Sequence, residues 1–346
     1  MKLLSIAVPC YNSAAYMRKC IDSLLPGGED VEIIIVNDGS GDSTPDIAEE
    51  YRERYPGIIK VVNKENGGHG SGVNKGLKLD TGKYFKVVDS DDWLDKKSYK
   101  KLLKKIKFWC DKEKIKQETI CPDMLICDYT YNHLEEGIKK RMGYRNVFPM
   151  DKVYTWDQIG TFYPSQYLIM HALIYCTDTL RTSGIVLPEH TFFVDNLFAY
   201  CPLPYMKTLY YMDINLYQYY LGREDQSVNE KMLMARIEQH IKVTKLVANS
   251  VDLNKIKKQH PKLANYMCRN VSIMMAISSI HLLLRGDALA KLWYYKLWSD
   301  IKENNPKLYF RLRYTTLSGL TNLPGKLGKS ATIKGYRIAK KIYKFQ

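Results

Sequence analysis

The sequence predicts an α/β protein with a mostly parallel central sheet that has helices on both faces, followed by a C-terminal helical region. Three observations lead to this expectation. Short apolar runs alternate with amphipathic segments over about the first ninety residues. From about residue 229 onward, apolar residues recur at helical spacing. The composition, with 45% hydrophobic and 26% charged residues in a chain of 346, is that of a folded globular protein.

Strands and helices are expected to alternate in the first part of the chain. Each predicted strand is a short apolar run, and the first one stops at Pro9. Because buried strands alternate with helices, the connections should be right-handed crossovers and the strands parallel. The expected strands are residues 3–8, 31–36, 58–62 and 83–88. The expected helices are residues 14–25, 45–55 and 71–79.

The rest of the chain is less regular before it becomes helical. A lysine-rich helix is expected over residues 95–118 and a strand over 121–129. An irregular aromatic insert is expected over 130–165, and mixed strand and helix over 166–222. The helical pattern then covers residues 230–249, 262–285 and 287–303.

The net charge and the cysteine content indicate which binding partners and which cellular compartment suit the protein. The formal charge of +15 admits nucleic acid, an anionic membrane face or an anionic substrate. Eight cysteines without a CxxC pair argue against a structural zinc site and suit reduced thiols in the cytoplasm. The apolar run before Pro9 is too short for a signal peptide, and the stretch from Val271 to Leu284 is too short to span a bilayer.

Polar residues follow every predicted strand, and the carboxyl ends of parallel strands form the ligand-binding edge of such sheets. The fourth strand leads into DSDDWLD, residues 89–95. Carboxylates two residues apart can share Mg²⁺ or Mn²⁺ with phosphate oxygens. The alternative is a solvated acidic turn in which Asp92 or Asp95 caps the next helix. The dinucleotide fingerprint fails at Val73, and no P-loop spacing is present.

In this order, the segments SIAVPCYNS, EIIIVNDGSGDST, ENGGHGSGVNKGL and KVVDSDDW resemble the nucleotide-sugar-binding half of glycosyltransferase family 2, which has the GT-A fold. The resemblance covers about 95 residues and fades after about residue 230. It implies a GT-A catalytic domain over 1–225, with a nucleotide-sugar-binding half at 1–95 and an acceptor half at 96–225. Residues 226–346 would form the helical region with a basic amphipathic tail.

The resemblance implies inverting transfer from a nucleoside-diphosphate sugar, helped by Mn²⁺ or Mg²⁺, and it assigns roles to matching positions. Asp91 would hold the metal, and Asp89 would hold the ribose side and share the metal. The family often has Ala-Arg where this chain has Gly72-Val73, so a cation expected near the nucleotide is missing. Either Lys75 substitutes for it or the donor sits differently, which leaves the base open, with uracil as the default expectation. The other nucleotide-sugar positions would be Pro9, Tyr11, Asn12, Asp38, Asn66 and Gly67.

The resemblance also places a catalytic base about 100 residues after the metal motif. Here LPEHTFFVDNLF puts Asp195 at that position, with Val194 where the family usually has Glu. An apolar setting would raise the pKa of Asp195 toward that of a useful base. The alternative is that Asp195 caps a helix starting at Asn196, and Glu189 is the second candidate for the base.

Four side chains are weaker candidates for contacts with the donor or the acceptor. Arg223, in the loop after the last strand, could pair with diphosphate oxygens, or it could be a surface residue beside Glu224. Trp93 and His171 could face the acceptor, as could Glu189, or they could simply be packing residues.

The C-terminal segment 333–345 is expected to form a basic amphipathic helix. Its lysines and arginines fall on one side of a helical wheel, and Tyr336, Ile338 and Ile342 fall on the other. Such a helix suits an anionic membrane surface, although it could instead pack on the domain with its basic face in solvent.

Together these features predict a cytoplasmic, non-processive enzyme at the inner face of the cell membrane. It would move one sugar from a nucleotide-sugar donor to a glycan or a lipid-linked acceptor. The alternatives are a sugar-phosphate nucleotidyltransferase, which usually has a basic glycine-rich loop after the first strand, and a nucleic-acid-binding module. The residues PCYNSAAY occupy the place of that loop, and the basic tail carries few aromatic platforms, so neither alternative is favoured and no nucleic acid partner is expected.

Overall fold

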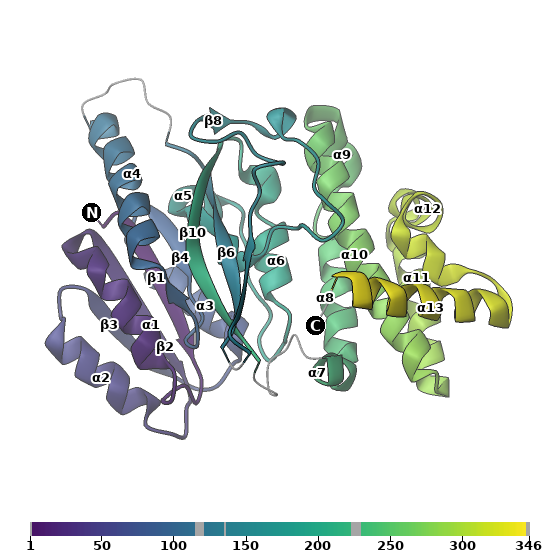
Figure 1. The fold of residues 1–346 in the computed structure, drawn as a ribbon, viewed down its shortest axis with the longest axis horizontal. Coiled ribbons are helices and arrows are strands. Elements are labelled where there is room, and N and C mark those ends of the chain that lie inside the picture. Colours follow the sequence, from purple (N-terminus) through teal and green to yellow (C-terminus); the bar gives the residue numbers. More distant parts are fainter. Residues whose placement is uncertain (1, 115–120, 135, 223–229, 344–346) are drawn as a thin grey trace. The chain divides into compact units, whose positions relative to one another are not determined.

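The computed structural model describes residues 2–114, 121–134, 136–222 and 230–343 (Figure 1). The chain separates into two compact units, Met1–Gly222 and Arg223–Gln346. The predicted boundary between residues 225 and 226 lies close to this division, in a stretch outside the described residues.

The first half of the N-terminal unit is the predicted alternation of parallel strands and helices. Its strands lie in the order β3-β2-β1-β4, and all their mutual pairings are parallel. Every residue of β1, β2 and β4 is buried, which explains why these strands are continuous apolar runs. The bounds are β1 (Leu4–Cys10), β2 (Val31–Asp38), β3 (Ile59–Lys64) and β4 (Tyr84–Val87).

The second half makes the sheet mixed rather than parallel throughout. The sheet continues from β4 in the order β9-β6-β10-β5, and β9 runs antiparallel to both β4 and β6. The stretch expected to be irregular holds the end of β6, a strand β7 paired with it, and a strand β8 paired with β10. The bounds are β5 (Trp93–Leu94), β6 (Met124–His133), β7 (Ile138–Met142), β8 (Val153–Tyr154), β9 (Leu173–Cys176) and β10 (Leu209–Leu221).

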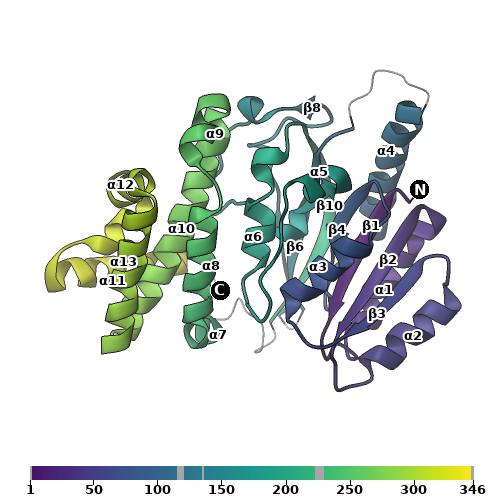
Figure 2. The same cartoon turned by 180° about the vertical axis from the view of Figure 1, so that it is seen from behind.

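Helices cover both faces of this sheet, as the sequence predicts. Helices α1 and α4 lie on one face and α3, α5 and α6 on the other (Figures 1 and 2). The α-helices are α1 (Met17–Leu24), α2 (Thr44–Arg54), α3 (His69–Leu79), α4 (Lys96–Lys114), α5 (Thr177–Thr182) and α6 (Asp195–Tyr200). The 3₁₀ turns are η1 (Leu25–Asp30), η2 (Trp156–Gln158), η3 (Met170–Ala172) and η4 (Leu203–Tyr205).

The C-terminal unit is helical and is built around one long helix, α10, which contacts α8, α9, α11, α12, α13 and η5. Among the described helices, α10 is the one with the length and apolar composition needed to cross a bilayer, and 61% of its most apolar stretch is buried. The elements are α7 (Glu230–Ala235), α8 (Ile237–Asn249), α9 (Leu253–Gln259), α10 (Pro261–Arg285), α11 (Ala288–Asn304), α12 (Pro306–Thr315), η5 (Leu317–Asn322) and α13 (Gly325–Tyr343).

Candidate active site

The aspartates of the acidic segment 89–95, which follows β4, make different contacts. Asp95 Oδ1 accepts a hydrogen bond from the Ser98 backbone N–H at 2.8 Å, so Asp95 caps the start of α4. Asp92 is fully buried and accepts hydrogen bonds from Tyr217 Oη at 2.6 Å and from the Tyr220 N–H at 2.7 Å. Burial, with the negative charges of Asp91 and Asp89, raises the pKa of Asp92 well above its usual value.

Two histidines meet at the carboxylate of Asp89. His69 Nε2 lies 2.8 Å from Asp89 Oδ1, and His171 Nε2 lies 3.2 Å from Asp89 Oδ2. Burial favours the neutral form of Asp89, but the two imidazoles outweigh it and lower the pKa of Asp89 below its usual value. Burial also works against the charged form of His69, yet the charge of Asp89 raises the pKa of His69. Asp89 is therefore held as a carboxylate by imidazoles from α3 and η3.

The second half of the sheet supplies an aromatic and cationic backing to this cluster. The ring of His171 stacks on Tyr219, with ring centroids 4.4 Å apart, and meets Tyr217 edge-on at 4.7 Å. Lys86, on β4, is completely buried, and its Nζ donates to the His171 carbonyl at 2.8 Å. Burial lowers the pKa of Lys86 to about 8. Tyr219, Tyr217 and Lys86 therefore hold His171 in place. The structure puts His171 in the acidic cluster, whereas the sequence suggested contact with the acceptor.

The donor atoms suit a divalent cation. One ligand atom each from Asp89, Asp92 and His171 lies within 4.8 Å of the others. His171 Nε2 lies 3.2 Å from Asp89 Oδ2 and 3.9 Å from Asp92 Oδ2, and carboxylate oxygens and imidazole are ligands that manganese accepts. Asp91, the predicted metal ligand, is half-buried and stands outside this group of three.

The first two strands end in the predicted nucleotide residues. Pro9 is buried in β1 against Gly72, where a Cβ would lie 3.0 Å from the Pro9 ring. Tyr11 is 57% exposed, which leaves its ring accessible for stacking. Asn12 has a left-handed backbone (φ 49°), and its side chain accepts a hydrogen bond from the Gly41 N–H at 2.9 Å.

Asp38 organises the glycine-rich turn after β3. Its carboxylate accepts hydrogen bonds from the Gly67 N–H at 3.0 Å, the Gly68 N–H at 2.7 Å and Lys64 Nζ at 2.6 Å. Asn66 Nδ2 donates to the Asp38 carbonyl at 2.9 Å. The predicted residues Asp38, Asn66 and Gly67 therefore form one hydrogen-bonded unit, in which the Asp38 side chain is largely occupied by protein donors.

The loop that carries the predicted base crosses the same turn. The His190 N–H donates to the Gly67 carbonyl at 2.6 Å, and the backbones of His190 and Phe193 are left-handed (φ 46° and 65°). Non-glycine residues adopt this conformation at a cost of about 1–3 kcal/mol, and such strain concentrates at functional sites. Glu189 Oε1 accepts a hydrogen bond from Ser71 Oγ at 2.6 Å, so the second candidate base is engaged by α3.

Asp195 lies in the electrostatic reach of the acidic cluster. Helix α6 begins at Asp195 with Val194 as its N-cap, so Asp195 is not the capping residue that the alternative interpretation required. Burial raises the pKa of Asp195, while His171 and His69 act in the opposite direction. A half-buried carboxyl with a raised pKa is a stronger base than an ordinary aspartate.

Of the two remaining candidates, the structure describes Trp93 but not Arg223. Trp93 lies on β5, and Lys19 Nζ sits 3.1 Å from the centroid of its ring, so one face of the indole is covered. Arg223 lies outside the described residues.

Sequence reasoning missed His69 and Lys86. His69 stands inside the quoted segment ENGGHGSGVNKGL but received no role, and Lys86 interrupts the apolar run of the fourth strand. A lysine within a strand that must be buried on both faces was the available signal for Lys86. At the position where the family often has Arg, Val73 is buried, and His69, one turn earlier on α3, reaches the acidic cluster instead.

Residues 5–112 match the profile of the family described as Glycosyl transferase family 2. The matched segment contains all four of the motifs that resemble this family. EpsJ of Bacillus subtilis, named as an uncharacterized glycosyltransferase, is 43% identical over 101 residues, which are 29% of each of the two chains. GgaB of the same organism, a minor teichoic acid biosynthesis protein, is 35% identical over 102 residues, which are 29% of this chain and 11% of GgaB. The chain spans less than a third of the length of either relative.

The fold of the whole chain, helical region included, is similar to that of TarS from S. aureus. The TarS 1-349 crystal structure has a TM-score of 0.65 at 20% identity and covers 99% of this chain and 91% of its own. The complex of the same fragment with UDP-GlcNAc has a TM-score of 0.64 at 18% identity and covers 98% and 92%. At this identity the likeness is one of fold. It confirms the expected GT-A domain followed by a helical region.

Proposed function

We propose that the protein is a metal-dependent, inverting and non-processive glycosyltransferase of the hexosyltransferase type. It transfers one sugar from a nucleoside-diphosphate donor to a hydroxyl group of a cell-surface glycan or a lipid-linked acceptor. The observation that carries this proposal is the acidic cluster at the carboxyl end of β4, with Asp195 in its electrostatic field, inside a family 2 domain.

The donor would lie along the ends of β1 and β2. The exposed ring of Tyr11 offers a stacking surface for the base, and Pro9 and Asn12 border it. The turn at Asn66 and Gly67, which Asp38 holds in place, brings backbone close to the nucleotide. The TarS fragment was crystallised with UDP-GlcNAc and with UDP, and this supports a UDP-sugar as the donor.

Residues after β4 would hold the cation. Asp89 and Asp91 are the ligands that the sequence predicts, and Asp92 and His171 are donors that the geometry adds. A divalent cation bound there would offset the charge of the departing nucleoside diphosphate. Tyr219 stacks on the His171 imidazole and Lys86 anchors the His171 backbone carbonyl, while His69 would keep Asp89 ionised and oriented.

Asp195 would take the proton of the acceptor hydroxyl during the single displacement. Its raised pKa strengthens it as a base relative to an ordinary aspartate. Glu189 is the less suitable candidate because Ser71 already donates a hydrogen bond to it. Trp93 and Glu189 remain candidates for contact with the acceptor, and Arg223 for contact with the diphosphate.

The relatives and the charge support a proposal for the acceptor and for the location. GgaB is named for teichoic acid biosynthesis, which supports a cell-wall or surface-polymer acceptor. The net charge of +15 supports a cytoplasmic enzyme that is peripheral on the anionic inner face of the cell membrane.

A donor panel tests the proposal. The full chain is incubated with UDP-, GDP- and TDP-sugars and lipid-linked acceptors, with Mn²⁺ or with a chelator, and release of nucleoside diphosphate is measured. We expect release from one donor class that stops with chelator. No release from any donor would overturn the proposal. Production of pyrophosphate from a sugar 1-phosphate and a nucleoside triphosphate would favour a nucleotidyltransferase.

A further inference from the structure

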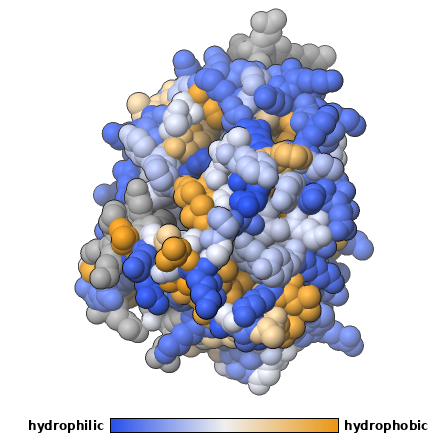
Figure 3. All heavy atoms as spheres, turned by 90° about the vertical axis from the view of Figure 1, so that its right-hand side faces the viewer, coloured by the Kyte–Doolittle hydropathy of each residue, from blue (hydrophilic) through white to orange (hydrophobic). Residues whose placement is uncertain are grey.

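The helical unit carries a row of exposed large apolar side chains between α12 and the start of α13. We call this row the apolar ridge. Its members are between 43% and 88% exposed. Figure 3 looks toward α11, α12 and α13 and shows apolar patches between strongly hydrophilic ones. The apolar ridge consists of Phe310, Tyr314, Leu317, Leu320, Leu323 and Leu327.

The apolar ridge belongs to a braced segment. The guanidinium of Arg313 donates to the carbonyls of Gly319 at 3.3 Å and Asn322 at 3.1 Å, which ties η5 to α12. Thr332 Oγ1 donates to the Leu320 carbonyl at 2.8 Å, which ties α13 to η5. Ser272 Oγ, on α10, donates to Thr316 Oγ1 at 2.8 Å. The fold therefore holds these side chains outward instead of letting them turn into the core.

Within the apolar ridge, neighbouring side chains support one another. The rings of Phe310 and Tyr314, one turn apart on α12, have centroids 5.7 Å apart. Leu317 and Leu320 are three residues apart in the 3₁₀ turn η5, where such side chains eclipse each other. An exposed apolar surface of this kind on a folded protein marks an interaction site.

The charge around the apolar ridge indicates what covers it. From Asn304 to the C-terminus the sequence has ten lysines and arginines and no acidic residue. Lys307, Lys326 and Lys334 are exposed. A second copy of the chain related by a twofold axis would set this cationic surface against itself, which is unfavourable. Lysine is also depleted at protein interfaces, whereas apolar side chains ringed by lysine suit an anionic bilayer.

The tail helix itself is less free than the sequence suggested. On α13, Tyr336 lies against His281 of α10, with ring centroids 5.8 Å apart, and Lys340 is ion-paired with Glu230. Tyr336, which belongs to the predicted apolar face of the tail, thus packs within the helical unit. The accessible apolar surface lies before it, in the apolar ridge.

We propose that the apolar ridge inserts into the interfacial layer of an anionic phospholipid membrane while the surrounding lysines contact lipid phosphates. This inference rests on the membrane location proposed above and names the surface responsible for it. Placing a leucine side chain in the acyl boundary strengthens binding by about tenfold, and each lysine near an anionic leaflet by about fivefold.

Co-sedimentation of the full chain with vesicles tests the proposal. Vesicles of phosphatidylcholine alone are compared with vesicles that also contain phosphatidylglycerol. The ridge variant is Leu317→Gln with Leu327→Gln, and its control is Leu246→Gln, at a residue of α8 that is 41% exposed. The charge variant is Lys326→Gln with Lys334→Gln, and its control is Lys100→Gln with Lys101→Gln on α4.

The wild-type chain is expected to bind the anionic vesicles, and both control variants should bind like it. The ridge variant should bind at least about tenfold more weakly, and the charge variant should lose most of the preference for phosphatidylglycerol. Circular dichroism and thermal unfolding of each variant confirm that it is folded.

Three results would overturn the proposal. The wild-type chain could fail to bind anionic vesicles, or the ridge variant could bind them as tightly as the wild type. Alternatively, sedimentation could show a wild-type dimer that the ridge substitutions dissociate, and a second copy would then be the occupant. Nucleoside diphosphate release is measured in parallel. If the wild-type chain binds anionic vesicles but releases no nucleoside diphosphate, the proposed activity is refuted and the proposed membrane-binding surface still stands.

Discussion

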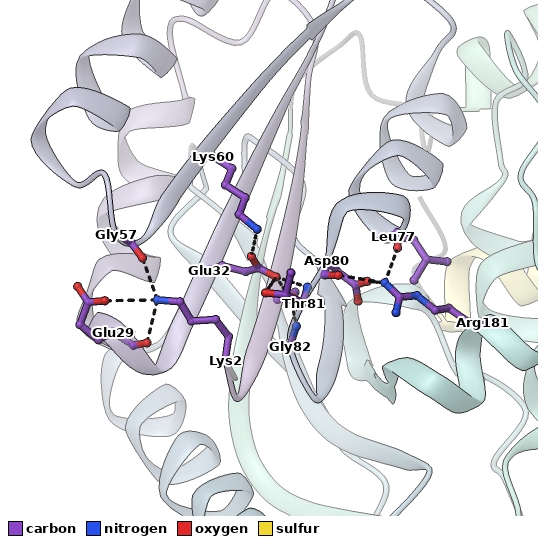
Figure 4. A network of polar contacts seen from close by, with 11 residues as sticks. Lys2, Glu29, Glu32, Gly57, Lys60, Leu77, Asp80, Thr81, Gly82 and Arg181 are labelled. Atoms are coloured by element: carbon purple, nitrogen blue, oxygen red, sulfur yellow. Dashed lines mark hydrogen bonds and ion pairs between the residues drawn. The ribbon is translucent and has the colours of Figure 1, made fainter.

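The two ends of the central sheet both bury carboxylates, but they neutralise them in different ways. At the amino end, Glu32 of β2 is 1% exposed. It accepts hydrogen bonds from Ser5 Oγ, Lys60 Nζ and the Thr81 N–H, each at 2.5 Å (Figure 4). Burial alone would raise the pKa of Glu32, and these donors lower it.

The neighbouring residues at the amino end follow the same pattern. Asp80 is paired with Arg181, although burial raises the pKa of Asp80 to about 6. Lys2 Nζ donates to the Glu29 carbonyl at 2.9 Å and the Gly57 carbonyl at 2.8 Å. Every charge in this network meets a protein partner of opposite sign or a hydrogen-bonding group (Figure 4).

At the carboxyl end, acids lie beside acids. Asp89 meets imidazoles, and Asp92 meets a tyrosine hydroxyl and a backbone N–H. Burial and neighbouring negative charge raise the pKa of Asp92, and burial raises that of Asp195. The amino end therefore pairs its charges within the protein, whereas the carboxyl end holds neighbouring carboxyl groups whose pKa values are shifted in opposite directions, which is typical of functional sites.

The largest expected effect is at the carboxyl end. Asp195→Asn removes the proposed base, so turnover should fall by about 10²–10⁴-fold while donor affinity stays unchanged. Steady-state kinetics and calorimetric titration of the donor measure the two quantities. Glu189→Gln is the matched control and should keep most of the activity. If Glu189→Gln loses turnover and Asp195→Asn keeps it, Glu189 is the base.

The pH profile of kcat/KM should carry the signature of a raised carboxyl pKa. A base must be deprotonated to act, so the rate falls about tenfold per pH unit below the pKa of Asp195. Because burial raises that pKa in the folded protein, the fall should begin at higher pH than an ordinary aspartate would give. A rate that stays level down to the usual aspartate range would contradict the assignment.

A smaller effect is expected from Lys86→Met. The substitution keeps the volume of the buried side chain but removes the donor to the His171 carbonyl. A shifted imidazole should lower kcat/KM by about tenfold, since small displacements near a reacting centre are costly. The free energy of unfolding is measured alongside. Unchanged kinetics would show that Lys86 has no positioning role.

The smallest effect on catalysis is expected at the amino end. Glu32→Gln should leave kcat unchanged and lower the free energy of unfolding by about 1–3 kcal/mol, because Lys60 and Ser5 lose a charged partner. The folded-state pKa of Glu32 is lowered, so its contribution is present above the unfolded-state pKa and is lost as pH falls through the folded-state value. Denaturation at neutral and acidic pH should therefore show a smaller acid dependence in the variant.

The sequence predicted the parallel half of the sheet because each of its strands is a local apolar run. It also singled out the acidic segment 89–95, because that segment follows a buried strand, whereas Asp195 was placed by the family resemblance. The antiparallel strand β9 was not predictable, because its partners β4 and β6 are chosen by contacts far apart in the chain.

The parts of the site that sequence reasoning missed depend on long-range geometry. His69 and His171 are about a hundred residues apart, and only the fold brings them to the two oxygens of Asp89. The protein donors that occupy Asp38 come from a loop whose shape no local pattern specifies. The apolar ridge was likewise hidden, because leucines at helical spacing are usually core residues.

Calorimetric titration of UDP-GlcNAc, with and without Mn²⁺, tests the contrast between the two ends most directly. The wild-type chain and Glu32→Gln should bind the nucleotide sugar with equal affinity, and both should need the metal. Asp89→Asn should weaken binding by at least about tenfold, because the carboxylate that both histidines hold is gone. Equal affinity in Asp89→Asn and in wild type, with or without the metal, would contradict the account.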